Sequence, residues 1–344
     1  MPTQQPTTPS ILITGAGGFV GGRLVESALE QGWIVWAGTR RNNLPHNSQS
    51  GTSTKPSNLH LIHLDYEHPE HLQEQITQAP RWQYVIHCAG LTRSVKPSDY
   101  ALVNTTYTLN LAQALMDTGK TPDKFLFMSS LEAIGPGDND PLKPITLDSP
   151  PQPVSAYGRS KLAAEEGLKT IKGLPWLILR PTGIYGPGDK DYLAMAKLVK
   201  SGLAPTLGLP PQRLSFLYVE DLVELCWLTL TSAVSGKTWL VAHPAIVEDR
   251  DYIDLLQDLL HKHRVLKVRI PLSLARGVAA LGEGLGRLSG KPVLINQDKY
   301  RIMAARNWSC DITALQEAVG YTPPTDLRTG WIKTLAWYRQ HGWL

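Results

Sequence analysis

A tyrosine and a lysine stand four residues apart at Tyr157 and Lys161, in a stretch whose pattern predicts a helix. On a helix, residues four apart share one face and lie about 6 Å from each other. A nearby ammonium favours the phenolate form, so we expect Lys161 to lower the pKa of Tyr157. A phenol tuned in this way can donate and accept a proton, which is general acid–base chemistry.

Three glycines follow the first apolar run of the chain and precede a helical pattern. The first suits a tight turn with positive φ, the second a close approach by a phosphate, and the third the packing of the helix on the strand. The first N–H groups of the helix are free to bind phosphate oxygens. The pattern therefore predicts a dinucleotide-binding turn, made by Gly15, Gly18, Phe19, Val20 and Gly21.

The second apolar run continues into Thr39-Arg40-Arg41. In dinucleotide-binding folds an acidic residue near this point binds the ribose 2′-hydroxyl of NAD, whereas arginine accommodates the 2′-phosphate of NADP. A charge-assisted hydrogen bond contributes about 1.5–3 kcal/mol. The pair therefore favours NADP(H), and NAD(H) is possible if both arginines are only solvated. Asp65, after the third run, is a candidate for the adenine amino group or for a helix cap.

The elements that must position these residues alternate between strand and helix, which requires a parallel sheet with right-handed crossovers. We expect an α/β fold: a doubly wound parallel sheet (Rossmann fold) over 10–180, to which elements near 214–243 return, and a smaller C-terminal α+β substrate lobe mainly over 181–344. Strands are predicted at 11–14, 34–39, 59–64, 84–89, 125–129, 176–179, 215–219 and 238–241. Helices are predicted at 19–31, 69–79, 99–118, 155–170, 190–201, 221–232, 251–263, 272–289, 311–319 and 326–340.

Residues 1–9 are expected to form a disordered tail, and the polar insertions 40–58 and 136–153 to form surface loops near a site. The 344 residues carry a net charge of +4 and are 42% hydrophobic, which excludes a disordered chain and makes nucleic acid an unexpected partner. The three cysteines, Cys88, Cys226 and Cys310, offer neither a disulfide framework nor a metal knuckle. With no secretory signal and no membrane-spanning run, we expect a cytoplasmic protein.

No metal site is expected. His60 and His63 should face opposite sides of a strand, and His68 and His71 lie at a polar helix start. His87 is interpreted as a packed residue at the end of a strand.

Three motifs together resemble the extended short-chain dehydrogenase/reductase family, which includes NAD-dependent epimerases and dehydratases. They are Gly15-x-x-Gly18-x-x-Gly21, Ser129-Ser130 at the end of a strand, and Tyr157-x-x-x-Lys161. Further family-like segments span 87–90, 104–111, 180–189 and 218–221. The resemblance covers most of the chain.

The resemblance implies a catalytic group of Asn104, Ser130, Tyr157 and Lys161. Tyr157 would exchange a proton with the substrate oxygen while hydride moves between the substrate carbon and nicotinamide C4, and Ser130 would hydrogen-bond that oxygen. Lys161 would hold the nicotinamide ribose, and Asn104 would belong to the proton-relay wall. Ser130 is preferred to its neighbour Ser129 because Gly135 follows it by five positions, as in the family. The cofactor site would also include Asp65, Tyr66, Ala89, Gly90, Pro181 and Thr182.

Family members act on sugar nucleotides or on hydrophobic alcohols and ketones. Many sugar-nucleotide enzymes place an asparagine where this chain has Gly183, and an arginine directly before the Ser-Phe pair that Leu214 precedes here. The segments 129–136 and 180–189 look more like the 3β-hydroxysteroid dehydrogenase and dihydroflavonol reductase branches. We expect an NADP-preferring oxidoreductase for an apolar or ring-bearing small molecule.

The alternative is a nucleotide-sugar epimerase or dehydratase that uses the same Ser-Tyr-Lys site. A non-catalytic NADP-binding sensor or RNA-associated protein would have little need for both Tyr157 and Lys161. The resemblance also makes a homodimer possible, through the helices around 101–118 and 157–170.

An apolar stripe recurs at helical spacing between positions 272 and 288. Core packing is the expected explanation, with a lipophilic lid over the substrate and a membrane-surface contact as alternatives. Membrane contact is otherwise not expected. The stripe comprises Leu274, Val278, Leu281, Leu285 and Leu288.

Overall fold

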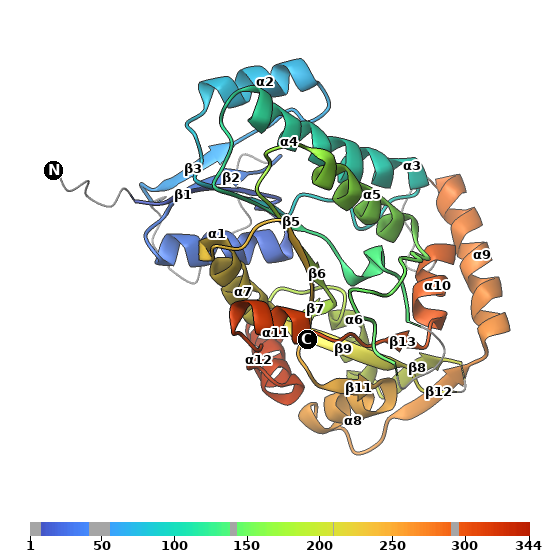
Figure 1. The fold of residues 1–344 in the computed structure, drawn as a ribbon. Coiled ribbons are helices and arrows are strands. Elements are labelled where there is room, and N and C mark those ends of the chain that lie inside the picture. Colours follow the sequence, from blue (N-terminus) through green and yellow to red (C-terminus); the bar gives the residue numbers. More distant parts are fainter. Residues whose placement is uncertain (1–7, 41–55, 138–142, 209, 290–295) are drawn as a thin grey trace.

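Seven parallel strands form the central sheet, in the order β10-β6-β5-β4-β1-β2-β3 (Figure 1). The computed structural model describes residues 8–40, 56–137, 143–208, 210–289 and 296–344. The sheet grows outward from β1 in both directions, so the crevice between β1 and β4 is the switch point at which such folds bind ligands. The strands are β1 Ser10–Thr14, β2 Ile34–Gly38, β3 Leu59–Ile62, β4 Tyr84–His87, β5 Lys124–Met128, β6 Trp176–Pro181 and β10 Lys237–Val241.

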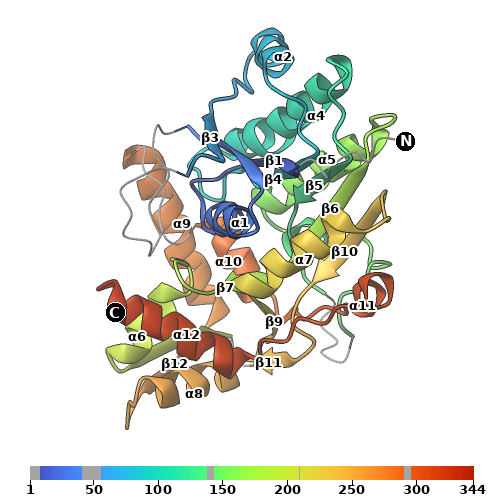
Figure 2. The same cartoon turned by 90° about the vertical axis from the view of Figure 1, so that its left-hand side faces the viewer.

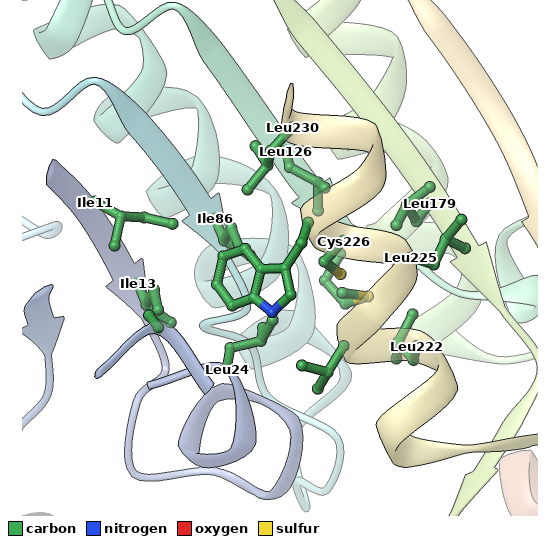
Figure 3. Close-up of a cluster of buried hydrophobic side chains, with 14 of the residues drawn as sticks. Ile11, Ile13, Leu24, Ile86, Leu126, Leu179, Leu222, Leu225, Cys226 and Leu230 are labelled. Carbon is green, nitrogen blue, oxygen red and sulfur yellow. The ribbon is translucent and has the colours of Figure 1, made fainter. Parts of the chain in front are cut away.

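Helices cover both faces of this sheet, because successive strand side chains point to opposite sides. On one face, α1 (Phe19–Glu30) and α7 (Val219–Thr231) pack on the sheet, and Figure 3 shows α7 leucines meeting the β1, β4, β5 and β6 side chains. The helices α2 (Pro69–Gln78), α4 (Tyr107–Asp117) and α5 (Ala156–Thr170) cover the other face.

The second half of the chain adds a lobe with its own core and its own small sheets (Figure 2). In the larger of these sheets, β9 pairs with β7, β11 and β13, and elsewhere β8 pairs with β12. These strands are β7 Gly183–Tyr185, β8 Leu203–Leu207, β9 Arg213–Tyr218, β11 Ile246–Glu248, β12 Leu266–Ile270 and β13 Asn307–Trp308. The helices are α6 Leu193–Lys200, α8 Asp249–Leu259, α9 Leu272–Ser289, α10 Gln297–Ala304, α11 Thr313–Val319 and α12 Leu327–Gln340.

The predicted Rossmann sheet and its flanking helices are confirmed, with three corrections. The predicted helix 99–118 is three segments, namely α3 (Pro97–Tyr100), a π-helical turn over Ala101–Thr106, and α4. Of the elements expected to return to the main sheet, β10 and α7 do so, but β9 centres the second sheet. The strands β7, β8, β11, β12 and β13 and the helix α10 were not predicted; β7, β11 and β13 have only two or three residues, whereas β8, β12 and α10 are as long as elements that were predicted.

The expected tail and surface loops lie partly outside the described residues, at 1–7, 41–55 and 138–142. In the described remainder of 136–153 there is neither a helix nor a strand, apart from a bridge between Ile145 and Cys310.

Candidate active site

The glycine turn has the conformation that its residue types predict. Gly15 has φ +69°, and a Cβ there would lie 2.7 Å from the backbone of Ala89. A Cβ on Gly21 would lie 2.2 Å from the carbonyl oxygen of Gly15, so only glycine lets α1 pack on the turn. Gly18 precedes α1 without a side chain to cap it, which leaves the N–H groups of the first helical turn directed at the crevice.

Ala89 and Gly90 connect this turn to the predicted catalytic residues. A Cβ on Gly90 would lie 3.2 Å from Oδ1 of Asn104 and 3.4 Å from Nζ of Lys161. Since Gly15 contacts Ala89 on the other side, the glycine turn and Lys161 lie at the same end of the sheet. A side chain at position 90 would crowd Asn104 and Lys161, so glycine keeps the backbone between the turn and Lys161 without a side chain.

The π-helical turn sets the position of Asn104, which is fully buried. Its Oδ1 accepts a hydrogen bond from the N–H of Leu91 at 2.6 Å. Its Nδ2 donates to Oγ of Ser160 on α5 and to the Leu91 carbonyl, each at 3.0 Å. π-Helical turns are frequent at functional sites. Here the turn ties the loop after β4 to the helix that carries Tyr157 and Lys161.

Tyr157 and Lys161 lie on one face of α5, as predicted, and Nζ of Lys161 is 5.9 Å from the centre of the tyrosine ring. The Lys161 ammonium is buried and donates to the Met128 carbonyl at 2.8 Å. Burial lowers the pKa of Lys161 to about 8, although Cys88 and Glu165 act in the opposite direction.

The predicted lowering of the Tyr157 pKa is wrong. Burial, and next the nearby Glu132 carboxylate, raise the pKa of Tyr157 above its ordinary value, and a side-chain hydrogen bond with Ser130 only partly offsets them. The physical reason is that the phenol is desolvated beside a carboxyl group, while Lys161 turns its ammonium toward a backbone carbonyl. At neutral pH the phenol therefore keeps its proton.

The adjacent serines separate as strand geometry requires. Ser130 lies beside Tyr157, and its Oγ accepts the N–H of Glu132 at 3.1 Å. Ser129 is buried, and its hydroxyl donates to the carboxylate of Glu165. That carboxylate also accepts a bidentate pair of hydrogen bonds from Arg180 on β6. Ser130 is thus the serine on the Tyr157 side.

His87 is a packed residue, as interpreted from the sequence, and it belongs to a buried hydrogen-bond chain. Its Nδ1 lies 2.8 Å from the Thr14 hydroxyl, and its Nε2 lies 2.9 Å from the Thr108 hydroxyl. Thr108 in turn donates to the carbonyl of Asn104. Burial, and then the charge of Lys161, lower the pKa of His87 to about 3, so the ring is neutral. The chain links β1, β4 and the π-helical turn.

Asp65 and Tyr66 lie beyond β3, where the adenine contact is expected. Oδ1 of Asp65 accepts N–H groups of Glu67 and His68 at the start of α2, and the Tyr66 carbonyl is held by Nδ2 of Asn110 at 2.9 Å. His68 and His71 both turn Nδ1 toward Asp65. Within the described ranges, these three are the side chains whose ligand atoms could together hold a metal ion. All four contacts of the Asp65 carboxylate are made with residues at or near the exposed start of α2.

Arg40 is exposed and lies two residues after the end of β2. Thr14 at the end of β1 pairs with Gly38 at the end of β2, so Arg40 follows the strand end that adjoins the glycine turn. Arg41 lies outside the described residues.

Pro181 is the last residue of β6, beside Val241 of β10, and Thr182 follows it. The Thr182 hydroxyl donates to the Ser215 carbonyl at 2.8 Å, which joins the two sheets. Next to them is Gly183, where a Cβ would lie 1.8 Å from the hydroxyl oxygen of Tyr192. The Tyr192 side chain therefore occupies the space into which any side chain at position 183 would point.

Three site residues were missed by sequence reasoning. Glu132 is half-buried, its carboxylate accepts the Ser155 hydroxyl at 2.6 Å, and burial raises its pKa. Asp298 on α10 accepts the N–H of Ala156 at 2.7 Å, directly before Tyr157. Tyr192 is the third. Glu132 could have been found from its position two residues after Ser130. The contact between Asp298 and Ala156 spans 142 residues of chain, so no local sequence pattern indicates it.

The comparisons with known proteins agree with this geometry. The model of the NAD dependent epimerase/dehydratase family matches residues 11–242, and the chain belongs to that family. It is 26% identical over 94% of its length to a UDP-glucose 4-epimerase of Vibrio cholerae, of which it covers 94%. It is 25% identical over 97% of its length to a ceramide reductase of Caulobacter vibrioides, of which it covers 96%.

Among solved structures, MoeE5 in complex with UDP-glucose and NAD has the same fold. Its TM-score is 0.71 at 23% identity, over 96% of this chain and 99% of MoeE5. In the part of this chain that the structure describes, no helix has both the length and the apolar character needed to cross a bilayer.

Proposed function

We propose that this chain is an NAD(P)-dependent oxidoreductase that transfers hydride between nicotinamide and a ketone or secondary alcohol on an apolar or ring-bearing small molecule. The observation that carries the proposal is the grouping of Tyr157, Ser130, Lys161 and Asn104 at the end of the sheet that also carries the glycine turn, to which Ala89 and Gly90 connect them. Such a grouping supplies a proton next to a dinucleotide site.

The residues present fit a nicotinamide dinucleotide. A Cβ at Gly15 or Gly21 would collide with the backbone, and one at Gly90 would narrow the space beside Lys161. The first turn of α1 offers its N–H groups to a pyrophosphate. When bound, the nicotinamide supplies or accepts the hydride.

Each side chain then has a part in moving the proton. Tyr157 holds a phenolic proton at neutral pH, since its pKa is raised, and donates it to the carbonyl oxygen during reduction. Ser130 is hydrogen-bonded to Tyr157 and orients the same oxygen. Lys161 donates to the Met128 carbonyl and has two further N–H groups for a ribose hydroxyl. Asn104 holds the loop after β4 against α5.

The preference for NADP(H) rests on residue types after β2. Gly38, Thr39 and Arg40 provide no carboxylate to receive a ribose 2′-hydroxyl, and Arg40 together with Arg41 provides positive charge for a 2′-phosphate. NAD(H) would bind more weakly through the same glycine turn.

The proposed substrate class follows from Gly183 and Tyr192. In the extended short-chain dehydrogenase/reductase family, many sugar-nucleotide enzymes have an asparagine at the position of Gly183, where it contacts the substrate diphosphate. Here a tyrosine side chain fills that space, and the phenol of Tyr192 is buried among aromatic side chains. The similarity to a ceramide reductase supports a lipophilic carbonyl or alcohol.

The test is a set of initial-rate measurements with purified protein. We expect consumption of NADPH with ring-bearing or long-chain ketones, and no interconversion of UDP-glucose and UDP-galactose. Epimerase activity without net change in nicotinamide redox state would establish the alternative, which the similarity to a UDP-glucose 4-epimerase supports. If the protein bound NADPH but showed neither activity, a non-catalytic NADP-binding protein would be favoured.

A further inference from the structure

The helix α9 faces the rest of the protein with its small residues and faces solvent with its large apolar ones. Ala275 and Ala279 are buried, whereas Leu281 is 72% and Leu285 is 65% exposed. The full outward set, called here the outer face of α9, is Leu274, Val278, Leu281 and Leu285. The prediction that core packing explains this stripe is therefore wrong for these four residues, because the residues that α9 buries between them are Ala275 and Ala279; the side chain of Leu288 lies outside the described part of the chain.

The exposed apolar surface of the molecule is concentrated around this helix. Among the described residues, twelve large apolar side chains are exposed, and seven of them lie between positions 262 and 306. Besides the outer face of α9 they are Leu266, Leu272 and Met303. The four on α9 recur at helical spacing and therefore share one face, and an exposed apolar face marks a binding surface, whereas scattered exposed leucines need no explanation.

The same segment is strongly basic. Residues 262–306 contain ten lysines and arginines against two acidic residues, a net charge of +8, while the whole chain carries +4. The rest of the chain is therefore net negative. Arg264, Arg276, Lys299 and Arg301 of this segment are exposed. A helix with an apolar face and basic surroundings has the chemistry of an interfacial helix on an anionic membrane.

We propose that the outer face of α9 docks on an anionic lipid surface, with the helix lying in the plane of the interface. The 18-residue helix is not apolar enough to span a bilayer, so the proposed contact is with one leaflet only. This revises the expectation that the protein makes no membrane contact. Figure 1 shows α9 at the outer edge of the molecule, with α10 beside it.

The docked face adjoins the candidate active site through α10. Nε2 of Gln297 on α10 donates to the carbonyl of Arg276 on α9, and Asp298 accepts the N–H of Ala156. One short helix thus contacts both α9 and the residue before Tyr157. If the proposed function holds, this places the opening for a lipophilic substrate beside the lipid from which it would come.

Flotation of the full chain with vesicles tests the docking. We expect binding to phosphatidylcholine vesicles that contain phosphatidylglycerol and little binding to phosphatidylcholine alone. Raising NaCl from about 0.1 M to about 1 M, which shortens the Debye length from about 10 Å to about 3 Å, should release most of the bound protein. The double variant Leu281→Asp/Leu285→Asp should bind the vesicles at least about tenfold more weakly than the natural chain.

Ile332→Asp is the matched control, because Ile332 is 52% exposed but lies on α12, apart from α9 in Figure 1. Arg264→Glu/Arg276→Glu should weaken binding to anionic vesicles and leave the fold intact. Absence of binding by the natural chain, or equal loss in Ile332→Asp, would overturn the proposal. So would lipid-free self-association that the double α9 variant abolishes, since a second copy would then cover this face.

The docking result is independent of the proposed reaction. Tyr157→Phe should float with vesicles as the natural chain does, because Tyr157 is not on the outer face of α9. If no ketone is turned over and the vesicles still bind, the proposed function fails and the docking stands.

Discussion

The guanidinium of Arg180 lies against the carboxylate of Glu165 in a buried pair, with Nη2 2.6 Å from Oε2 and Nε 3.0 Å from Oε1. The pair joins β6 to α5, one helical turn after Lys161. Ser129 adds its hydroxyl to the same carboxylate. Removing one charge from such a pair leaves the other uncompensated in a low-dielectric interior.

Glu165→Gln should therefore lower the free energy of unfolding by about 3–5 kcal/mol, measured by urea denaturation. Ser129→Ala removes one hydrogen bond from the network and should cost only about 1 kcal/mol. Glu165→Met/Arg180→Met removes both charges. Its free energy of unfolding should therefore be closer to that of the natural chain than that of Glu165→Gln is. If Glu165→Gln left the free energy of unfolding unchanged, Arg180 would have to find another partner.

Tyr157→Phe should reduce turnover by about 10²–10⁴-fold, because it removes the proton donor but little volume. Cofactor affinity, measured by the quenching of protein fluorescence, should change little. Tyr100→Phe is the control, since the Tyr100 ring packs edge-on against Tyr157 and its hydroxyl instead accepts the N–H of Ser94. Full activity in Tyr157→Phe would remove Tyr157 from the chemistry.

Lys161→Met should stabilise the protein near neutral pH while abolishing activity. The pKa of Lys161 falls from its ordinary 10.5 to about 8 in the folded chain, so between those values the unfolded chain binds more protons. The charged lysine thus costs on the order of 3 kcal/mol below about pH 8, and the stability of the natural chain rises as the pH increases toward 10.5.

The expected gain in Lys161→Met is about 1–3 kcal/mol at pH 7, since the hydrogen bond to Met128 is lost, and it should shrink by about pH 9.5. Urea denaturation at both pH values measures it. Lys172→Met, at an exposed lysine, should show no such pH dependence. A loss of stability in Lys161→Met at pH 7 would contradict the direction of the pKa shift.

Arg40→Ala/Arg41→Ala should weaken NADPH binding by about ten- to a hundred-fold and NADH binding far less, because only NADPH carries the 2′-phosphate. Calorimetric titration with both cofactors measures the difference. Arg81→Ala, which removes an exposed arginine paired with Asp123, is the control for the loss of a surface positive charge elsewhere on the molecule. Equal losses for the two cofactors would mean that the arginines do not recognise the phosphate.

Gly183→Ala should cost at least about 2 kcal/mol of stability, because its methyl group would overlap the Tyr192 hydroxyl. In a Tyr192→Phe background the nearest atom becomes ring carbon Cζ at 3.0 Å, and the cost should fall by more than half. Thermal unfolding of the four proteins in the cycle gives the coupling energy. Additive effects would show that Tyr192 moves aside freely.

The sequence predicted those parts of the molecule that local pattern determines. The glycine turn, the strands of the main sheet and the shared face of Tyr157 and Lys161 depend on residues close in the chain. The direction of the pKa shift at Tyr157 could not be predicted, since it depends first on the burial of the phenol and then on Glu132, and both follow from the packing of separate elements.

The orientation of α9 also escaped sequence reasoning. Its periodicity shows that the large apolar residues share a face, but the same period fits a buried stripe and an exposed one. Only the packing of Ala275 and Ala279 inward decides between them. Likewise, Asp298 approaches Ala156 from α10, an element that was not predicted and that lies 142 residues further along the chain.

The overlap between position 183 and Tyr192 also bears on how enzymes of this family diverge. A lineage that exchanged the proposed substrate class for a phosphorylated sugar would have to shrink the tyrosine before it could gain an amide side chain, since the reverse order passes through a poorly folded intermediate. Such sign epistasis separates the two specificities by an ordered pair of changes. Directed evolution from this chain should therefore fix the mutation at Tyr192 first.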